Sequence, residues 1–351
     1  MSEQSLLQSS PGVSGYWRKR AIICILVLLA GLGGYSGWWW LAAAQLEKGI
    51  QGWIDMRRAE GVVVGYESLQ INGFPQLIRV RVQKPKAEPI KGDFWSWQGN
   101  TLSFQARPWN FSRVSYDLSG PQSGNLLLKG KIEPFTFRAK TLAGDVTLKK
   151  GRLNTVRSQG KDIVFQLSNY EDVIAISDIE TTLAQSDNHL INLDTRLRDL
   201  RISQLSEFPL GERVRHLRVK AALPGWLPRN RNIDALARWR DEGGKIDITS
   251  LDLGYGAVQV TGDGSFVLDS TLQPAGNFSA RVVGISGALD AVQQNGLIGP
   301  RDAMAVKLAV GVLSKTPEGG GDRYLDVPVK IQNRTVQIGP FKLKPFPAIN
   351  W

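Results

Sequence analysis

The sequence predicts a mainly β protein with an α+β C-terminal part, attached to a membrane by one N-terminal helix. Two observations support this fold class. Residues 21–44 contain no charged side chain, and about 20 apolar residues are enough to cross the hydrocarbon core of a bilayer. From residue 62 to residue 222, apolar side chains recur at every second position, which is the period of a strand with one buried face.

The N-terminal segment reads as a membrane anchor with a defined orientation. Three cations precede the apolar run: Arg18, Lys19 and Arg20. Three indoles close it, where such rings favour the membrane interface: Trp38, Trp39 and Trp40. Because basic flanks stay in the cytoplasm, we predict a cytoplasmic tail over residues 1–20, a transmembrane helix over residues 21–44 and the bulk of the chain on the outer side.

A cleaved signal peptide is the alternative interpretation of the same segment. Ala42 and Ala44 form an A-x-A-like site, although three bulky tryptophans separate that site from the apolar core. The only cysteine, Cys24, lies inside the apolar run. The remainder of the chain therefore has no disulfide and depends on its hydrophobic core for stability.

Composition narrows the choice of partners. The chain has 43 Lys+Arg against 32 Asp+Glu, a net charge of +11. Such an excess fits nucleic acid, an anionic membrane surface or simple solubility. A location outside the cytoplasm argues against nucleic acid and leaves the membrane surface and other proteins.

After the anchor, residues 45–61 predict a helix that ends at Gly61 and that either continues the membrane helix or kinks near Gly49 and Gly52. Residues 62–222 predict an antiparallel meander with turns every 8–12 positions. One face of each strand is apolar and the other is polar. The meander must curl into a barrel, a sandwich or an open, trough-like sheet, and alternation alone does not choose among them.

Residues 223–232, with two prolines and a glycine, predict a linker to an α+β part over residues 233–351. In that part a short helix starts after Asn232 and stops at Gly243, and a hairpin and another strand follow. Two further helices span residues 288–295 and 300–314, the second with Pro300 at its first position. Two strands close the chain, and we expect the helices on one face of a smaller antiparallel sheet.

The stretch 69–80, LQINGFPQLIRV, predicts the first hairpin after the membrane helix. Asn72-Gly73 suits a two-residue type I′ turn, in which both central residues have positive φ. Pro75 holds Phe74 extended and removes a ladder donor, which is tolerated at an edge or at the first residue of a strand. We interpret these four residues as a structural motif and keep a ligand contact through Phe74 as a second hypothesis.

No catalytic, cofactor-binding or metal-binding constellation is recognisable in the sequence. The two histidines, His189 and His216, lack neighbouring ligands at metal-site spacing. Phosphate-binding loops, Gly-x-Ser-x-Gly elbows and His-Glu-x-x-His motifs do not occur. We therefore expect no enzyme activity, no cofactor and no metal.

Two groups of side chains remain as candidates for surface contacts. The cations of residues 213–220 predict a solvated sheet face, with attraction to anionic head groups as the alternative; alternation puts Arg213 and Arg215 on one face and Arg218 and Lys220 on the other. Tryptophans near predicted turns fit either a core or the rim of a groove for an amphipathic ligand. They are Trp95, Trp97, Trp109 and Trp226.

Several of these motifs together resemble one known family. They are the anchor, the Trp-bearing helix that ends at Gly61, INGFPQL, the WRDEGG and LDLGYG unit and the terminal VQIGPF. The chain resembles the domain of unknown function 2125 family of bacterial membrane-anchored or exported proteins over most of residues 20–351, with Asn333-Arg334 where Asn-Gly is expected at the last turn. The resemblance implies an uncharacterised envelope protein and brings no catalytic residues. In plan, the chain is also similar to AsmA-like envelope proteins, which are associated with lipid movement.

These observations lead to one expectation and one alternative. We expect a single-pass protein of the bacterial inner membrane, with its bulk in the periplasm, that shelters a lipid or another amphipathic ligand in cell-envelope maintenance. The alternative is a non-enzymatic scaffold with a closed β core that interacts with other envelope proteins. Whether the apolar face of the meander is covered decides between them.

Overall fold

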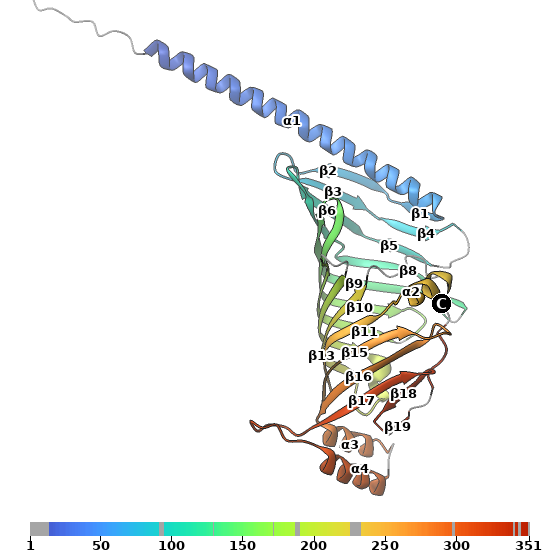
Figure 1. Ribbon diagram of the computed structural model, residues 1–351. Helices are drawn as coiled ribbons and strands as arrows, with labels where there is room; N and C mark the ends of the chain where they lie inside the picture. Colours follow the sequence, from blue (N-terminus) through green and yellow to red (C-terminus); the bar gives the residue numbers. More distant parts are fainter. Residues whose placement is uncertain are drawn as a thin grey trace, which may run out of the picture.

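The computed structural model describes residues 14–90, 95–128, 130–170, 172–186, 190–224, 233–296, 299–339, 341–342 and 345–349. A long helix lies across one end of a tall antiparallel sheet, and two short helices lie at the other end (Figure 1). This arrangement confirms the predicted fold class. The meander is neither a barrel nor a sandwich: it is one open sheet.

Helix α1 (Ser14–Ala59) is continuous over 46 residues, a length of about 69 Å at 1.5 Å per residue. It runs straight through the predicted membrane segment and the predicted second helix, without a break at Gly49 or Gly52. It ends as predicted at Gly61, whose φ of 87° is left-handed and whose N–H bonds to the carbonyl of Arg58 at 3.0 Å. It is the one helix in the described part of the chain that is long and apolar enough to cross a membrane.

The sheet begins as two arms that join on a single long strand, β9 (Lys131–Lys149). One arm pairs in the order β1–β4–β5–β8, with bounds Val62–Gly65, Lys86–Pro89, Ser96–Gly99 and Gly120–Leu128. The other pairs in the order β2–β3–β6–β7, with bounds Ser68–Asn72, Ile78–Gln83, Thr101–Arg107 and Asn110–Asp117. Strand β8 pairs with the first half of β9 and β7 with its second half.

From β9 onward, each strand pairs with the next one in the chain. The strands are β10 (Arg152–Leu167), β11 (Val173–Gln185), β12 (Leu190–Ile202), β13 (Arg213–Pro224), β14 (Ile246–Tyr255), β15 (Val258–Leu268), β16 (Pro274–Val283), β17 (Tyr324–Gln332), β18 (Thr335–Ile338) and β19 (Phe341–Lys342). Because β13 pairs with β14, the strands of the predicted C-terminal part extend the same sheet. Most of the predicted linker, with Trp226 and Asn232, lies outside the described residues.

Four short helices accompany the sheet in the part of the chain that the structure describes: η1 (Ser203–Glu207), α2 (Ile233–Asp241), α3 (Ile285–Gln294) and α4 (Pro300–Leu313). Helix α2 stops at Gly243 as predicted, with φ 83° and an N–H bond to the carbonyl of Arg240 at 3.0 Å. Pro300 occupies the first turn of α4 as predicted. In Figure 1, α3 and α4 lie at the end of the sheet farthest from α1.

A crease crosses the middle of β10 to β13. In β10, Lys161 and Asp162 are both exposed, between the buried Gly160 and Ile163, and Asp162 has a φ of 47°. The pairings on either side place Asp162 across from Ser177, and Ser177 across from Asp199. Since a left-handed residue interrupts the alternation of a strand, the apolar side chains of both halves face the same side. Figure 1 shows the sheet curved into a trough.

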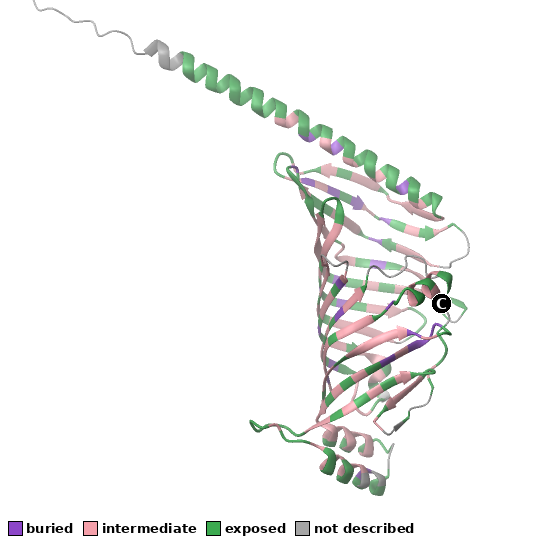
Figure 2. Ribbon diagram, viewed as in Figure 1, coloured by how far each residue is buried: buried purple, intermediate pink, exposed green. Residues whose placement is uncertain are grey.

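Within the described residues, no second layer covers the apolar face of the trough. Most strand residues are partly exposed, and fully buried ones are scattered (Figure 2). The chain has a solvent-accessible surface of 23864 Å², whereas a compact monomer of 38.7 kDa has about 14,000 Å². The exposed part of α1 and the uncovered sheet face both add to this surface. The closed β core of the alternative expectation is therefore wrong.

Candidate functional site

Helix α1 is docked onto the first hairpin through Trp39. The indole is 2% exposed and donates a hydrogen bond from Nε1 to the carbonyl of Leu77 at 3.1 Å. Its edge meets the ring of Phe74 at a centroid distance of 5.6 Å, and it packs in one cluster with Ala43 and Ile78. One turn earlier, the hydroxyl of Tyr35 donates a hydrogen bond to the carbonyl of Pro75. The hairpin tip therefore fixes the helix to the sheet.

The predicted flanks of the membrane segment have different surroundings. Trp38 and Trp40 are 42% and 68% exposed, and Lys19 and Arg20 are exposed as well. The side chain of Arg18 lies outside the described part. Membrane contact of the exposed indoles stays a prediction, whereas Trp39 contacts the sheet. Sequence reasoning missed this role because three adjacent tryptophans at the end of an apolar run carry no signal that separates them.

The predicted hairpin is present, but its turn is longer than predicted. Strands β2 and β3 pair from Ser68↔Gln83 to Asn72↔Arg79, so residues 73–77 form the loop. Of Asn72 and Gly73, only Gly73 has a positive φ, 106°, and the N–H of Leu77 closes the loop on the carbonyl of Gly73 at 2.9 Å. The two-residue type I′ turn at Asn72-Gly73 is therefore wrong. Pro75, in a cis bond after Phe74, lies at the tip rather than at the start of the strand.

Below the docked segment, α1 roofs an apolar cavity of about 520 Å³ between the two arms of the sheet. The helix contributes residues from Leu46 to Ile54, and one arm contributes Trp97 with the stem of Lys86. The other arm contributes the apolar sides of its strands: Leu69, Ile78, Val80, Val82, Leu102, Phe104 and Val114. A Cβ built on Gly49, which faces this cavity, would meet no atom within 4 Å. The cavity is thus unfilled next to the helix.

The tryptophans near the predicted turns have different surroundings. Trp97 is half-buried and lines the cavity, and its Nε1–H donates to the Gln122 side-chain carbonyl at 2.9 Å. Trp95 is also half-buried, and Trp109 is 62% exposed at the turn between β6 and β7. One predicted rim residue therefore lines an apolar site, with its polar edge satisfied by hydrogen bonding.

From the cavity, an apolar floor continues along the trough. Register places one row of paired residues across nine consecutive strands, β9 to β17, which is about 38 Å at 4.8 Å per strand: Leu142, Gly160, Ile179, Leu197, Leu217, Leu253, Val260, Val282 and Leu325. A second row begins at the cavity: Val114, Val146, Val156, Leu183, Leu193, Ala221 and Ile248. We call the cavity and this floor together the apolar groove.

The opposite, outer face of the sheet is polar and contains several ion pairs. The predicted cations all lie on it, because the register shift between Val214 and His216 reverses the alternation within β13. The split of Arg213 and Arg215 from Arg218 and Lys220 is therefore wrong, since all four side chains are exposed beside the buried Val214 and Ala221.

Carboxylates neutralise much of this outer face at the crease. Arg213 Nε lies 2.5 Å from Asp199 Oδ1 and Arg198 lies 3.2 Å from Asp178. The hydrogen bond from Arg213 is the main reason that the pKa of Asp199 is lowered. His216 Nε2 lies 3.0 Å from Asp252 Oδ1, and His189 lies outside the described residues. This pattern is typical of a solvated sheet face.

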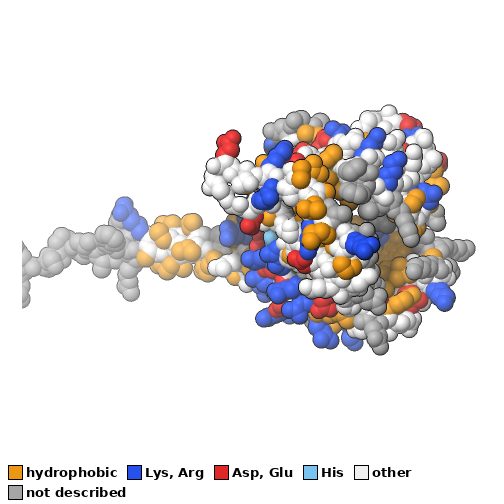
Figure 3. All heavy atoms as spheres, turned by 90° about the horizontal axis from the view of Figure 1, so that it is seen from below, with side chains coloured by type: hydrophobic (Ala, Val, Ile, Leu, Met, Phe, Trp, Pro, Cys, Tyr) orange, Lys and Arg blue, Asp and Glu red, His pale blue; other side chains and the backbone are white. Residues whose placement is uncertain are grey.

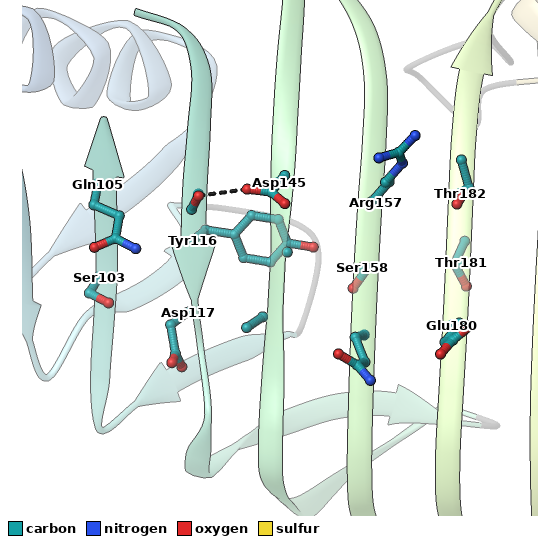
Figure 4. A pocket seen from close by; sticks show the side chains of 14 residues that line it. Ser103, Gln105, Tyr116, Asp117, Asp145, Arg157, Ser158, Glu180, Thr181 and Thr182 are labelled. Atoms are coloured by element: carbon teal, nitrogen blue, oxygen red, sulfur yellow. Dashed lines mark hydrogen bonds between the residues drawn. The ribbon is translucent and has the colours of Figure 1, made fainter. Parts of the chain in front are cut away.

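The outer face also has a shallow polar depression of about 590 Å³ across β6 to β11 (Figure 4). Ser115 donates a hydrogen bond to Asp145 at 2.6 Å, which lowers the pKa of that carboxyl group most, and Arg113 adds to the effect at 3.3 Å. Arg157 is the neighbour of Asp145 on β10. The carboxylate is thus held ionised between a hydroxyl and cations and is a weak candidate for a general base.

Comparison with known proteins identifies the family. The model of a family described as an uncharacterized protein conserved in bacteria (DUF2125) matches residues 39–347. The chain belongs to the DUF2125 family. The match begins at Trp39 and includes the docked half of α1, the whole sheet and α4. No curated protein and no solved structure matches this DUF2125 chain.

Proposed function

We propose that this DUF2125 protein shelters the acyl chains of a lipid, or a similar amphipathic ligand, in the apolar groove. The observation that carries the proposal is an uncovered apolar face that starts in a cavity directly beneath the candidate membrane helix. A cavity of about 520 Å³ is within the usual size range of ligand sites, about 300–1,000 Å³. Each buried methylene of an acyl chain contributes about 0.8 kcal/mol.

The location of the protein belongs to the same proposal. The protein is anchored in the bacterial inner membrane through α1, with its N-terminus in the cytoplasm and its sheet in the periplasm. The basic residues before the apolar run support this orientation. The exposed apolar surface of α1, with Leu26, Leu28 and Leu29 each more than half exposed, supports a lipid environment rather than a protein core.

The protein acts by binding and not by catalysis. The groove is lined almost wholly by aliphatic and aromatic side chains, which hold apolar ligands without offering a nucleophile or a base. Asp145 and Asp199, whose pKa values are lowered, lie on the outer face, away from the groove. Envelope maintenance is the process in which such a lipid-sheltering protein serves.

The experiment uses two glycines of α1 as a matched pair. At both Gly49 and Gly52 a Cβ would meet no atom within 4 Å, but only Gly49 lines the cavity. Gly49→Trp puts an indole into the cavity, whereas Gly52→Trp puts it outside. Both variants replace a glycine in a helix interior and gain helix propensity, so both should fold. Full-length protein is purified in detergent, extracted with organic solvent and analysed for lipid by mass spectrometry.

Wild type and Gly52→Trp are expected to carry lipid in near-equal amount, and Gly49→Trp is expected to carry much less. A wild-type protein without co-purified lipid after mild extraction refutes the proposal. An equal lipid content in the two variants refutes binding in the cavity, because the lipid would then be bound elsewhere.

A further inference from the structure

Helix α4, at the end of the sheet opposite α1, presents an apolar face to solvent. Three of its side chains form this face and are between 61% and 84% exposed: Met304, Leu308 and Val312. Met304, Leu308 and Val312 are four residues apart, so they lie above one another on one side of the helix. This uncovered apolar surface is separate from the apolar groove.

The opposite side of α4 holds the helix in place. Ala303 is 1% exposed, Lys307 pairs with Asp290 of α3, and Arg323 donates to the carbonyls of Gly311 at 2.7 Å and Ser314 at 3.2 Å. The helix is therefore anchored through its inner side and C-terminus. Its exposed apolar face is fixed in orientation and is not covered by any element in the described ranges.

Cations border this face. Arg301 is exposed at the first turn of α4, and Arg323 and Lys315 lie at its C-terminal end, where Lys315 pairs with Asp326 at 3.1 Å. Seen from below in Figure 3, hydrophobic side chains gather on the near surface with Lys and Arg side chains beside them. An apolar helix face bordered by Lys and Arg is typical of helices that lie in a membrane interface.

We propose that the exposed face of α4 docks onto an anionic phospholipid bilayer, at the opposite end of the sheet from the membrane that holds α1. A protein partner fits less well, because a stable protein interface contains about 20–30 residues on each side, and this face has three apolar side chains. A bilayer needs only a few inserted side chains together with cations near its charged surface. The proposal is independent of whether the groove holds a lipid.

The test keeps α1 occupied and offers a second membrane. Full-length protein is reconstituted into nanodiscs of phosphatidylcholine, mixed with vesicles that contain phosphatidylglycerol, and the vesicles are floated on a density gradient. The variants are Leu308→Glu on the apolar face and Arg301→Glu at its border. The matched control is Ile132→Glu, because Ile132 on β9 is 53% exposed but lies far along the sheet from α4.

Wild type and Ile132→Glu are expected to float with the anionic vesicles, and Leu308→Glu is expected to lose roughly tenfold of the bound fraction. Arg301→Glu should weaken binding to phosphatidylglycerol vesicles while leaving the residual binding to neutral vesicles unchanged. Circular dichroism confirms that each variant is folded. The proposal is overturned if wild type stays at the bottom of the gradient, or if Leu308→Glu floats as wild type does. It is also overturned if native mass spectrometry shows a wild-type dimer that Leu308→Glu abolishes, since α4 would then bind a second copy.

Discussion

Replacement of Trp39 by alanine tests whether the membrane helix is fixed to the sheet. The indole is 2% exposed, bonds to the Leu77 carbonyl at 3.1 Å and meets the Phe74 ring. Truncation of a buried tryptophan to alanine costs about 3–5 kcal/mol. Trp39→Phe keeps most of the apolar contact but leaves the Leu77 carbonyl without its donor, which costs about 1–3 kcal/mol if that group stays buried.

The neighbouring tryptophans supply the control. Trp38 and Trp40 are 42% and 68% exposed, and surface substitutions usually change stability by less than about 0.5 kcal/mol. Because all three indoles lie within one helical turn, a role at the membrane interface alone makes the three alanine variants equivalent. A role in docking makes Trp39→Ala different from the other two.

The assay is hydrogen exchange of the β3 amides in full-length protein held in nanodiscs, because α1 stays in the bilayer and only its docked half is released. A loss of 3–5 kcal/mol corresponds to exchange faster by about 100- to 5,000-fold. Trp39→Phe should give a smaller increase, and Trp38→Ala and Trp40→Ala should exchange as wild type does. Equal effects of Trp39→Ala and Trp40→Ala contradict the docking argument.

Three further predictions concern the backbone and the crease. Gly73→Val should destabilise the protein by about 1–3 kcal/mol more than Gly120→Val in chemical denaturation. The two glycines have similar φ values (106° and 103°), but only a Cβ at position 73 would lie 2.7 Å from a carbonyl oxygen. Equal losses of stability refute the steric reasoning. Arg334→Gly should raise stability by about 1 kcal/mol in thermal unfolding, because a φ of 59° is unfavourable for a side chain with Cβ; a lower melting temperature contradicts this. Asp199→Asn should lower the melting temperature at pH 7. The hydrogen bond from Arg213 lowers the pKa of Asp199, so the ionised carboxylate stabilises the fold above its unfolded pKa near 3.9. That contribution is lost as pH falls through the folded pKa, so the effect of the substitution should fade below pH about 4. A difference in melting temperature that persists at pH 2 contradicts this linkage.

Elements with a long, regular period were predictable from the sequence. The uncharged run 21–44 and the helical spacing that follows it predicted α1, and period-two alternation predicted the strands of the meander. Both signals come from the burial of one face, which repeats over many residues and tolerates local exceptions. The crease is such an exception: at Asp162 and Asp199 a positive φ reverses the faces, and aspartate in a strand carries no signal of it.

Turn chemistry was less predictable, because a turn depends on its neighbours as well as on its central pair. Asn72-Gly73 suited a type I′ turn, but the chain forms a longer loop there, with Phe74-Pro75 at its tip against α1. Asn333-Arg334 lacked the preferred glycine, yet φ values of 50° and 59° and the Gln332↔Thr335 pairing are those of a two-residue type I′ hairpin. Tertiary contact decided the first turn, and strand pairing decided the second.

The candidate site could not be located from the sequence, because alternation is the same in a closed barrel and in an open trough. The cavity forms because two arms of the sheet attach to one strand, β9, and α1 lies over both arms. Both are contacts between segments far apart in the chain. Trp97 was among the candidate rim residues, but nothing local distinguished it from Trp109, which is exposed.

The docked helix also sets the height of the groove relative to the membrane in the proposed topology. Residues 21–39 cover about 27 Å along a helix, which is close to the hydrocarbon thickness of about 30 Å. Trp39 and the hairpin tip then lie where the hydrocarbon ends. Leu46, the first helix residue of the cavity, is seven positions farther on, about 10 Å along the axis. Because the headgroup region adds roughly 5–7 Å on each side of the hydrocarbon, the cavity begins about 3–5 Å beyond the headgroups. A lipid that leaves the bilayer along α1 can therefore enter the groove without exposing its chains to a wide layer of water.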